Sequence, residues 1–173
     1  MEYKCTKYGV NQCSSDLLKA GTTDVVLDLE TDAAVYGPEE AFANVVWVPD
    51  SKHFAFNYSP PHAHHTIYQT VLFYELTGDK WGQWMEEEDE KAFATEIVRL
   101  GKENFPKSVH GSGEKAEPQI LKVHSWSDAS TATAYAIWSD GEVGLTLTLK
   151  FDASGKCKIL NPRRMSKQEL EQK

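Results

Sequence analysis

The chain has 173 residues, a length suited to one folded domain, and 40% of them are hydrophobic. Aromatic residues make up 11%, so the sequence has the side chains for a packed core and differs from disordered chains. Its net charge of −8 repels phosphate groups, which excludes nucleic acids and anionic membrane surfaces as expected partners. No apolar run reaches the roughly 20 residues that span a bilayer, so no membrane-embedded segment is expected.

The first residues and the three cysteines bear on the compartment. Met1 to Cys5 lack the apolar region of a signal peptide, so the chain either starts here in the cytoplasm or has lost a signal sequence. Cys5 and Cys13 are close together in a polar segment, where a short-loop disulfide is sterically feasible. Cys157 alternates with lysines, which predicts a small buried core residue. The cysteines favour a periplasmic or secreted protein, with the cytoplasm as the alternative.

The first half of the chain predicts strands after a polar start. Residues 1–22 are polar and predict an irregular N-terminal segment. From residue 24 onward, β-branched and aromatic residues dominate, and they predict a first β unit over residues 24–84. Within it Phe54, Phe56 and Tyr58 alternate with other residues, which places the three rings on one face of a strand.

A helix is predicted over residues 86–105. Acidic residues at positions 86–90 open the segment, where they suit the positive end of the helix dipole. Phe93, Ile97 and Leu100 then recur at spacings of three and four, so that one face of the helix can pack on a sheet.

Strand patterns resume after a loop rich in Gly, Ser and Lys. Residues 118–161 predict a second β unit of hairpins joined by short turns that contain Asp, Ser and Gly. Ser166 and Glu169 have the spacing of a capping box, so residues 166–173 predict a polar tail or a short helix. The expected fold is a single domain over residues 1–173, mainly β with one or two helices.

Two parts of the sequence repeat each other at nearly equal spacing. A Trp followed by a turn with Asp and Ser precedes a strand pair at residues 47–51 and again at residues 126–130. A second match links residues 72–80 with residues 149–156, each a strand that ends in a Gly-containing turn with Lys. The repeat predicts two related four-stranded antiparallel meanders.

The first copy, Trp47-Val48-Pro49-Asp50-Ser51, resembles the Trp-x-Pro-Asp-Gly/Ser stretch of TolB-type β-propeller blades, and Trp126 to Asp128 resembles a degenerate copy. The resemblance implies that the Pro-Asp-Ser segment turns between two inner blade strands and that each Trp packs against a neighbouring blade. Because a propeller needs at least about four blades, two copies imply blade-like sheets and no closed ring. A blade motif carries no catalytic residues.

The segment Pro61-His62-Ala63-His64-His65 is the strongest candidate for metal chemistry. In an extended chain His62 and His64 point to the same side, which makes them a half-site for Zn²⁺ or Cu²⁺. His65 would point away, and His53 on the partner strand could supply a third ligand. The alternative is a polar hairpin tip that holds no cofactor.

A second candidate is a surface for a protein partner. Trp81 and Trp84 come just before the acidic residues Glu86, Glu87 and Glu88. Exposed Trp residues supply large contact area, and neighbouring carboxylates steer a basic partner towards them. The alternative is that both Trp side chains fill the space between the helix and the sheet.

Enzyme motifs are absent from the sequence. It contains no Gly-x-Ser-x-Gly elbow, His-Glu-x-x-His pair, phosphate loop or dinucleotide fingerprint, which disfavours catalysis without excluding a site assembled from distant residues. The favoured function is therefore a non-catalytic, extracytoplasmic protein-binding module of the inhibitor or immunity type. A metal-binding domain and a hydrolase-type enzyme of another class are the alternatives.

Overall fold

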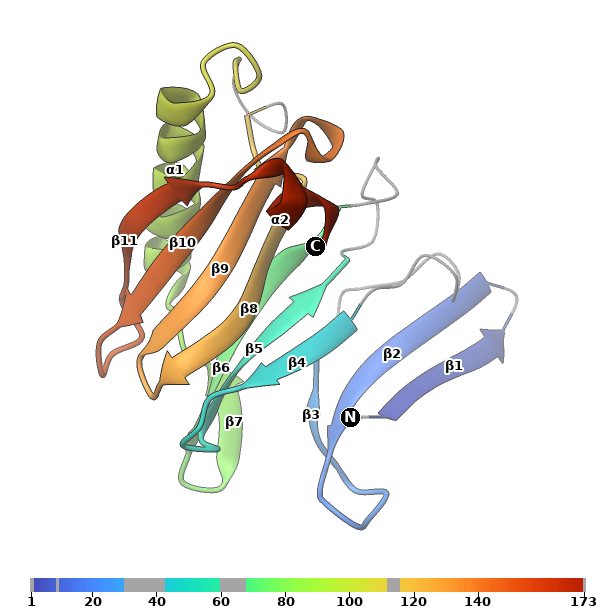
Figure 1. The fold of residues 1–173 in the computed structure, drawn as a ribbon. Helices are drawn as coiled ribbons and strands as arrows, with labels where there is room; N and C mark the ends of the chain where they lie inside the picture. Colours follow the sequence, from blue (N-terminus) through green and yellow to red (C-terminus); the bar gives the residue numbers. More distant parts are fainter. Residues whose placement is uncertain (1, 9, 30–42, 60–67, 112–115, 173) are drawn as a thin grey trace.

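Three antiparallel sheets and two α-helices form the part of the chain that the computed structural model describes, residues 2–8, 10–29, 43–59, 68–111 and 116–172 (Figure 1). The N-terminal sheet consists of β1 (Glu2–Tyr8), β2 (Val10–Leu18) and β3 (Val25–Asp28). The central sheet consists of β4 (Ala43–Trp47), β5 (His53–Tyr58), β6 (Thr70–Thr77) and β7 (Lys80–Gln83). The C-terminal sheet consists of β8 (Ile120–Asp128), β9 (Thr131–Trp138), β10 (Val143–Phe151) and β11 (Cys157–Arg164). The helices are α1 (Glu87–Asn104) and α2 (Lys167–Glu171), and Ser139–Gly141 form one 3-10 turn.

The central and C-terminal sheets are both meanders, in which each strand pairs with the next along the chain. This arrangement confirms the predicted mainly β fold with two antiparallel four-stranded sheets. Both helices lie where the sequence predicts them. Ser166 begins α2 as its N-cap, with its hydroxyl accepting a hydrogen bond from the Glu169 amide at 3.3 Å in a capping box.

The N-terminal region differs from the prediction in two ways. Residues 1–22 are not irregular, because they contain both strands of the β1–β2 hairpin. The strand predicted at the start of the first β unit, residues 24–84, pairs instead with β2 as β3. Polar strands such as β1 give no periodic apolar signal, since the backbone ladder rather than side-chain burial holds them together.

The main core lies where the C-terminal sheet meets the central sheet and α1 (Figure 1). The helix contributes Phe93, Ile97 and Leu100, the predicted apolar face, and all three are buried. On β9 and β10 small side chains are paired with large ones, which lets a second layer pack closely. The pairs are Ala132 with Leu149, Ala134 with Leu147 and Ala136 with Leu145. Each fully buried leucine contributes roughly 1.5–3 kcal/mol.

A second core lies on the opposite face of the central sheet. There Leu17 of β2 and Leu29 pack against Phe54, Phe56 and Tyr74 of β5 and β6. The predicted common face of Phe54 and Phe56 is therefore confirmed, and the N-terminal sheet covers it. The central sheet is thus covered on both faces, which explains the nearly continuous burial of β5.

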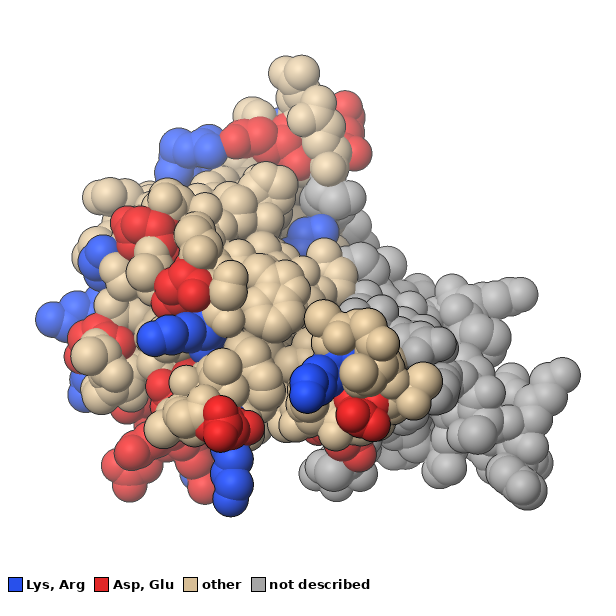
Figure 2. Space-filling model, turned by 90° about the horizontal axis from the view of Figure 1, so that it is seen from below, with Lys and Arg blue, Asp and Glu red and all other residues tan. Residues whose placement is uncertain are grey.

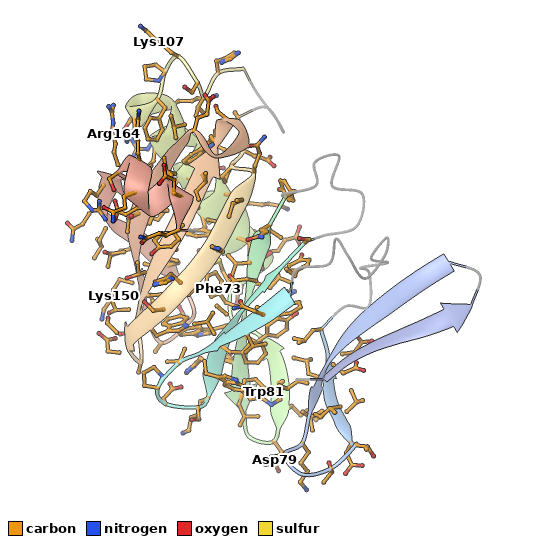
Figure 3. The ribbon with its side chains drawn as sticks, turned by 45° about the vertical axis from the view of Figure 1, so that its right-hand side comes forward. Phe73, Asp79, Trp81, Lys107, Lys150 and Arg164 are labelled. Atoms are coloured by element: carbon orange, nitrogen blue, oxygen red, sulfur yellow. The ribbon has the colours of Figure 1, made fainter. Side chains whose placement is uncertain are left out.

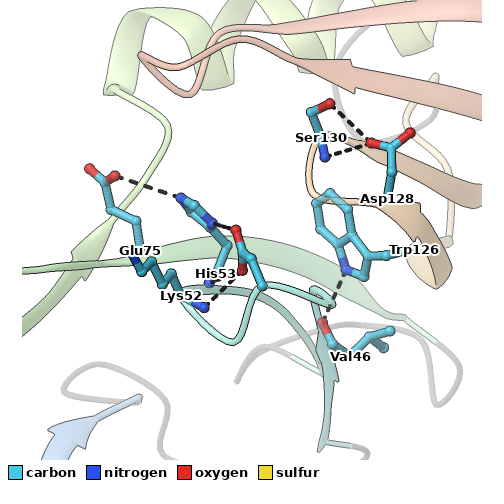
Figure 4. A network of polar contacts seen from close by, with 8 residues as sticks. Val46, Lys52, His53, Glu75, Trp126, Asp128 and Ser130 are labelled. Atoms are coloured by element: carbon cyan, nitrogen blue, oxygen red, sulfur yellow. Dashed lines mark hydrogen bonds and ion pairs between the residues drawn. The ribbon is translucent and has the colours of Figure 1, made fainter.

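Polar contacts join the central sheet to the C-terminal sheet at several points. The Gln69 amide donates to the Gln119 carbonyl at 2.8 Å, and the Leu121 amide donates to the Gln69 carbonyl at 2.9 Å. The Trp126 indole N–H donates to the carbonyl of Val46 in β4 at 3.1 Å (Figure 4). These bonds satisfy the backbone groups of Gln69 and Val46 at the junction, although the Gln69 side-chain oxygen is buried there without a hydrogen-bond partner among the described residues.

Asp residues organise the tight turns, as their sequence context predicts. The Asp128 carboxylate Oδ1 in the β8–β9 turn accepts hydrogen bonds from the Ser130 amide at 2.8 Å and the Ser130 hydroxyl at 3.0 Å (Figure 4). The Ser130 amide is the main cause that lowers the pKa of Asp128 to about 2. A lowered pKa in the folded state means that the charged carboxylate stabilises the fold near neutral pH, and that this stabilisation disappears in acid.

We therefore expect Asp128→Ala to reduce the free energy of unfolding at pH 7. The difference from the wild type should shrink as the pH falls from about 4 towards about 2, where the wild-type carboxylate also becomes protonated. Urea unfolding at a series of pH values measures this. The matched control is Ser127→Ala, which removes an uncharged hydrogen bond to the Thr131 carbonyl in the same turn, so its effect should not vary with pH. An Asp128→Ala difference that stayed constant down to pH 2 would contradict the expectation.

Candidate functional site

The β4–β5 turn places His53 between two carboxylates at one end of the central sheet (Figure 4). Asp50 Oδ1 accepts hydrogen bonds from the Lys52 amide at 2.8 Å and the His53 amide at 3.2 Å. Asp50 Oδ2 lies 2.7 Å from His53 Nδ1, and Glu75 Oε2 on β6 lies 4.0 Å from His53 Nε2. Asp50, His53 and Glu75 are named here the histidine node.

The electrostatics of the histidine node favour a charged Asp50. Burial acts to raise the pKa of the Asp50 carboxyl, but hydrogen bonds from the Lys52 and His53 backbone and from the His53 ring outweigh it and lower that pKa. The Val48 amide donates to the His53 carbonyl at 3.0 Å, which closes the turn next to Trp47. The contacts of the node therefore fix the turn that follows Trp47.

Trp84 lies in the core beneath the histidine node, which corrects its prediction as a partner-contact residue. Only 5% of its surface is exposed; its ring is stacked on Phe151 at a centroid distance of 4.7 Å and lies tilted against the His53 ring at 4.1 Å. The indole N–H has no hydrogen-bond partner among the described residues, so ring stacking holds the side chain. Trp84 therefore belongs to the main core, as the alternative of a buried Trp84 predicted.

Of the predicted metal ligands, only His53 lies in the described part of the chain. His53 is already engaged by Asp50 and Glu75, and His62, His64 and His65 lie outside the described residues. Among the residues that are described, no group of three or more His, Cys, Asp or Glu side chains is arranged to hold a metal ion. The metal site on His62 and His64 stays a prediction.

The acidic residues Glu86, Glu87 and Glu88 are exposed, as expected of a contact surface. Glu86 is the N-cap of α1, and the other two lie in its first turn, where the helix dipole favours carboxylates. Lys91 pairs with Glu87 at 2.5 Å one turn further on. These positions also have a purely structural explanation, because acidic first turns stabilise helices without any partner.

An exposed aromatic cluster lies on the N-terminal-sheet side of the same end of the central sheet. Trp47, at the end of β4, is 45% exposed and lies 5.7 Å from Trp81 of β7 in an edge-to-face arrangement. Both rings pack on Phe54, at 5.1 and 5.0 Å, and Phe54 is fully buried beneath them. Trp47, Trp81 and the underlying Phe54 are named here the aromatic patch. Trp81, predicted as a contact residue, is half-buried within it.

Charged turns surround the aromatic patch. Asp79 lies in the β6–β7 turn two residues before Trp81, and both are at the lower end of the sheets (Figure 3). Figure 2 looks onto this end and shows uncharged surface at its centre with acidic and basic groups around it. Exposed aromatic rings with charged residues near them have the organisation of a protein-contact surface.

The sequence pattern did not predict that Trp47 is exposed, and it indicated only a turn motif at this residue. One signal was available, because Trp47 alternates with Val45 and so lies on the same face as Phe54 at the end of an edge strand. Trp126, its counterpart in the repeat, instead donates to Val46 and is half-buried between the sheets. The two Trp residues of the repeat therefore have different environments.

No known protein family, curated protein or solved structure matches the chain. None of the helices in the described residues is both long and apolar enough to cross a lipid bilayer.

Proposed function

We propose that the protein is a non-catalytic protein-binding module that contacts its partner through the aromatic patch. The observation that carries the proposal is Trp47, a large apolar side chain left 45% exposed while ring contacts fix its position. Exposed aromatic anchors of this kind dominate the binding energy of protein interfaces. Because Phe54 and Trp81 already hold the ring, binding costs little side-chain entropy.

The partner is a protein segment that presents an Arg or Lys side chain next to apolar residues. A cation is attracted to the face of an exposed indole, with about 0.5–2 kcal/mol of stabilisation. Asp79 at the rim and the net charge of −8 steer a basic partner to this end of the protein. This charge pattern suits an inhibitor or immunity protein that covers the basic site of another protein, and we place that activity outside the cytoplasm.

Replacing Trp47 is expected to abolish most of the binding. Benzoylphenylalanine at Lys80, an exposed position next to Trp81 that leaves both Trp rings in place, would identify the partner by photo-cross-linking. The purified partner would then be titrated calorimetrically against wild-type protein and Trp47→Ala. Loss of a central Trp anchor weakens binding by at least about 2 kcal/mol, or about 30-fold in Kd. The supporting result is this loss in direct titration with the purified partner.

Leu160→Ala is the matched control, because Leu160 is 43% exposed, nearly as much as Trp47, but lies on β11 in the C-terminal sheet. Its Kd should stay within about twofold of the wild type. If Trp47→Ala and Leu160→Ala both bound like the wild type, the aromatic patch would not be the contact surface. Thermal unfolding of both variants separates a loss of contact from a loss of fold.

A further inference from the structure

The register of the N-terminal hairpin brings two of the three cysteines opposite each other. Cys5 of β1 and Cys13 of β2 are direct partners across the antiparallel ladder, between the pairs Lys4 with Ser14 and Thr6 with Gln12. Residues that are direct partners share one face of a sheet. The strand register therefore places Cys5 directly opposite Cys13.

The spacing of direct partners suits a disulfide. Opposed residues of an antiparallel pair have Cα atoms about 4.5 or 5.5 Å apart, depending on whether they exchange backbone hydrogen bonds. Disulfides need a Cα separation of about 4.4–6.8 Å, so both kinds of pair fall within the range. We propose that Cys5 and Cys13 form a disulfide that links β1 to β2, and this inference is independent of the aromatic patch.

The bond forms by thiol–disulfide exchange with an oxidant that is itself a disulfide, such as oxidised glutathione. One cysteine thiolate attacks a sulfur of the oxidant and releases one thiolate, leaving a mixed disulfide. The second cysteine thiolate then attacks the cysteine sulfur of that mixed disulfide and releases the other half of the oxidant. Two cysteine thiols lose two electrons and two protons, and the oxidant gains them as two thiols.

The third cysteine has a different environment and does not compete. Cys157 is paired with Phe151 at the start of β11, in the C-terminal sheet, and packs against the main core. Burial raises the pKa of its thiol to about 12, so the thiolate that exchange requires is scarce at neutral pH. The pairing of Cys5 with Cys13 is therefore expected to be the one that forms.

The bond would stabilise the fold through β2. That strand ends at Leu17 and Leu18, and Leu17 is buried against the central sheet, so the hairpin is joined to the second core. Closing a short loop restricts the unfolded chain, and the expected effect is a rise of about 5–10 °C in Tm over the reduced protein. It also favours an oxidising compartment, in agreement with the proposed location.

The test uses full-length wild-type protein and Cys157→Ser, each equilibrated in a glutathione redox buffer, quenched with acid and alkylated in denaturant. Cys157→Ser should be a monomer about 2 Da lighter than its reduced form and take up no alkyl group, while the wild type should take up one, at Cys157. Tryptic digestion of the wild type, which needs no substitution, should yield residues 5–7 linked to residues 8–19, because trypsin cuts after Lys4, Lys7 and Lys19.

Three results would overturn the proposal. The first is two alkyl groups on Cys157→Ser, the second is glutathione retained on both cysteines, and the third is a disulfide-linked dimer. In the first two cases the tryptic pair would be missing. A dimer linked through Cys5 and Cys13 of different chains would give the same tryptic pair, so it is recognised by its doubled mass before digestion. Binding by the aromatic patch is measured separately with Trp47→Ala, so failure here leaves that proposal standing.

Discussion

Replacing Gly155 with alanine is expected to destabilise the protein by about 3–5 kcal/mol, a large part of the total stability of a domain. Gly155 lies in the β10–β11 turn with φ +81°, where a side chain costs about 1–2 kcal/mol. An added Cβ would also lie 1.9 Å from the Trp84 carbonyl oxygen and 2.8 Å from Trp84 Cδ1. The first of these is a backbone atom, so relief of the clash requires the turn to move away from the core.

Gly78→Ala is the matched control for Gly155→Ala. Gly78 has a similar positive φ of +63° in the β6–β7 turn, but nothing lies within 4 Å of its added Cβ. Gly78→Ala should therefore lower the free energy of unfolding only by the cost of a side chain in the left-handed backbone conformation, about 1–2 kcal/mol. Equilibrium urea unfolding of both variants gives the difference, and equal losses would show that close packing against Trp84 does not matter.

The close approach of Gly155 to Trp84 also shows what the sequence could not predict. The strand of Phe54 and Phe56 and the capping box of Ser166 were predictable, because each depends on residues within a few positions of one another. Trp84 and Trp47 both follow strand-like stretches, yet one is buried and the other exposed. Their difference is set by the β10–β11 turn, which covers Trp84 from a distant part of the chain.

The candidate site was predictable to a similar extent. Trp81 and the acidic start of α1 were found from local patterns, whereas the pairing of Trp47 with Trp81 depends on their common position against Phe54 across the central sheet. The histidine node shows the same limit. Asp50 and His53 are neighbours within one turn, but Glu75 joins them only through the register of β5 with β6.

The second large loss of stability is expected at Asn57. Its side-chain amide bonds to the backbone of the neighbouring sheet in the way that a peptide group would. Asn57 is 1% exposed on β5, and its Oδ1 accepts from the Val123 amide at 2.8 Å while its Nδ2 donates to the Val123 carbonyl at 2.9 Å. Nδ2 also donates to Asn44 Oδ1 at 2.8 Å. The side-chain amide of Asn57 thus pairs with both backbone groups of Val123 on β8.

Asn57→Leu is expected to cost about 3–4 kcal/mol, measured by urea unfolding. Leucine has the same branched skeleton of four heavy atoms with bulkier methyl groups, so the substitution leaves no cavity, and the loss combines the missing hydrogen bonds with some overpacking. It leaves the amide and the carbonyl of Val123 buried without these partners, at about 1–3 kcal/mol each. Asn44→Ala, the control, removes only the bond at the exposed edge and should cost less than about 1 kcal/mol. A loss below 1 kcal/mol for Asn57→Leu would mean that water or a backbone shift satisfies Val123, and that the Asn57 bridge contributes little to joining the two sheets.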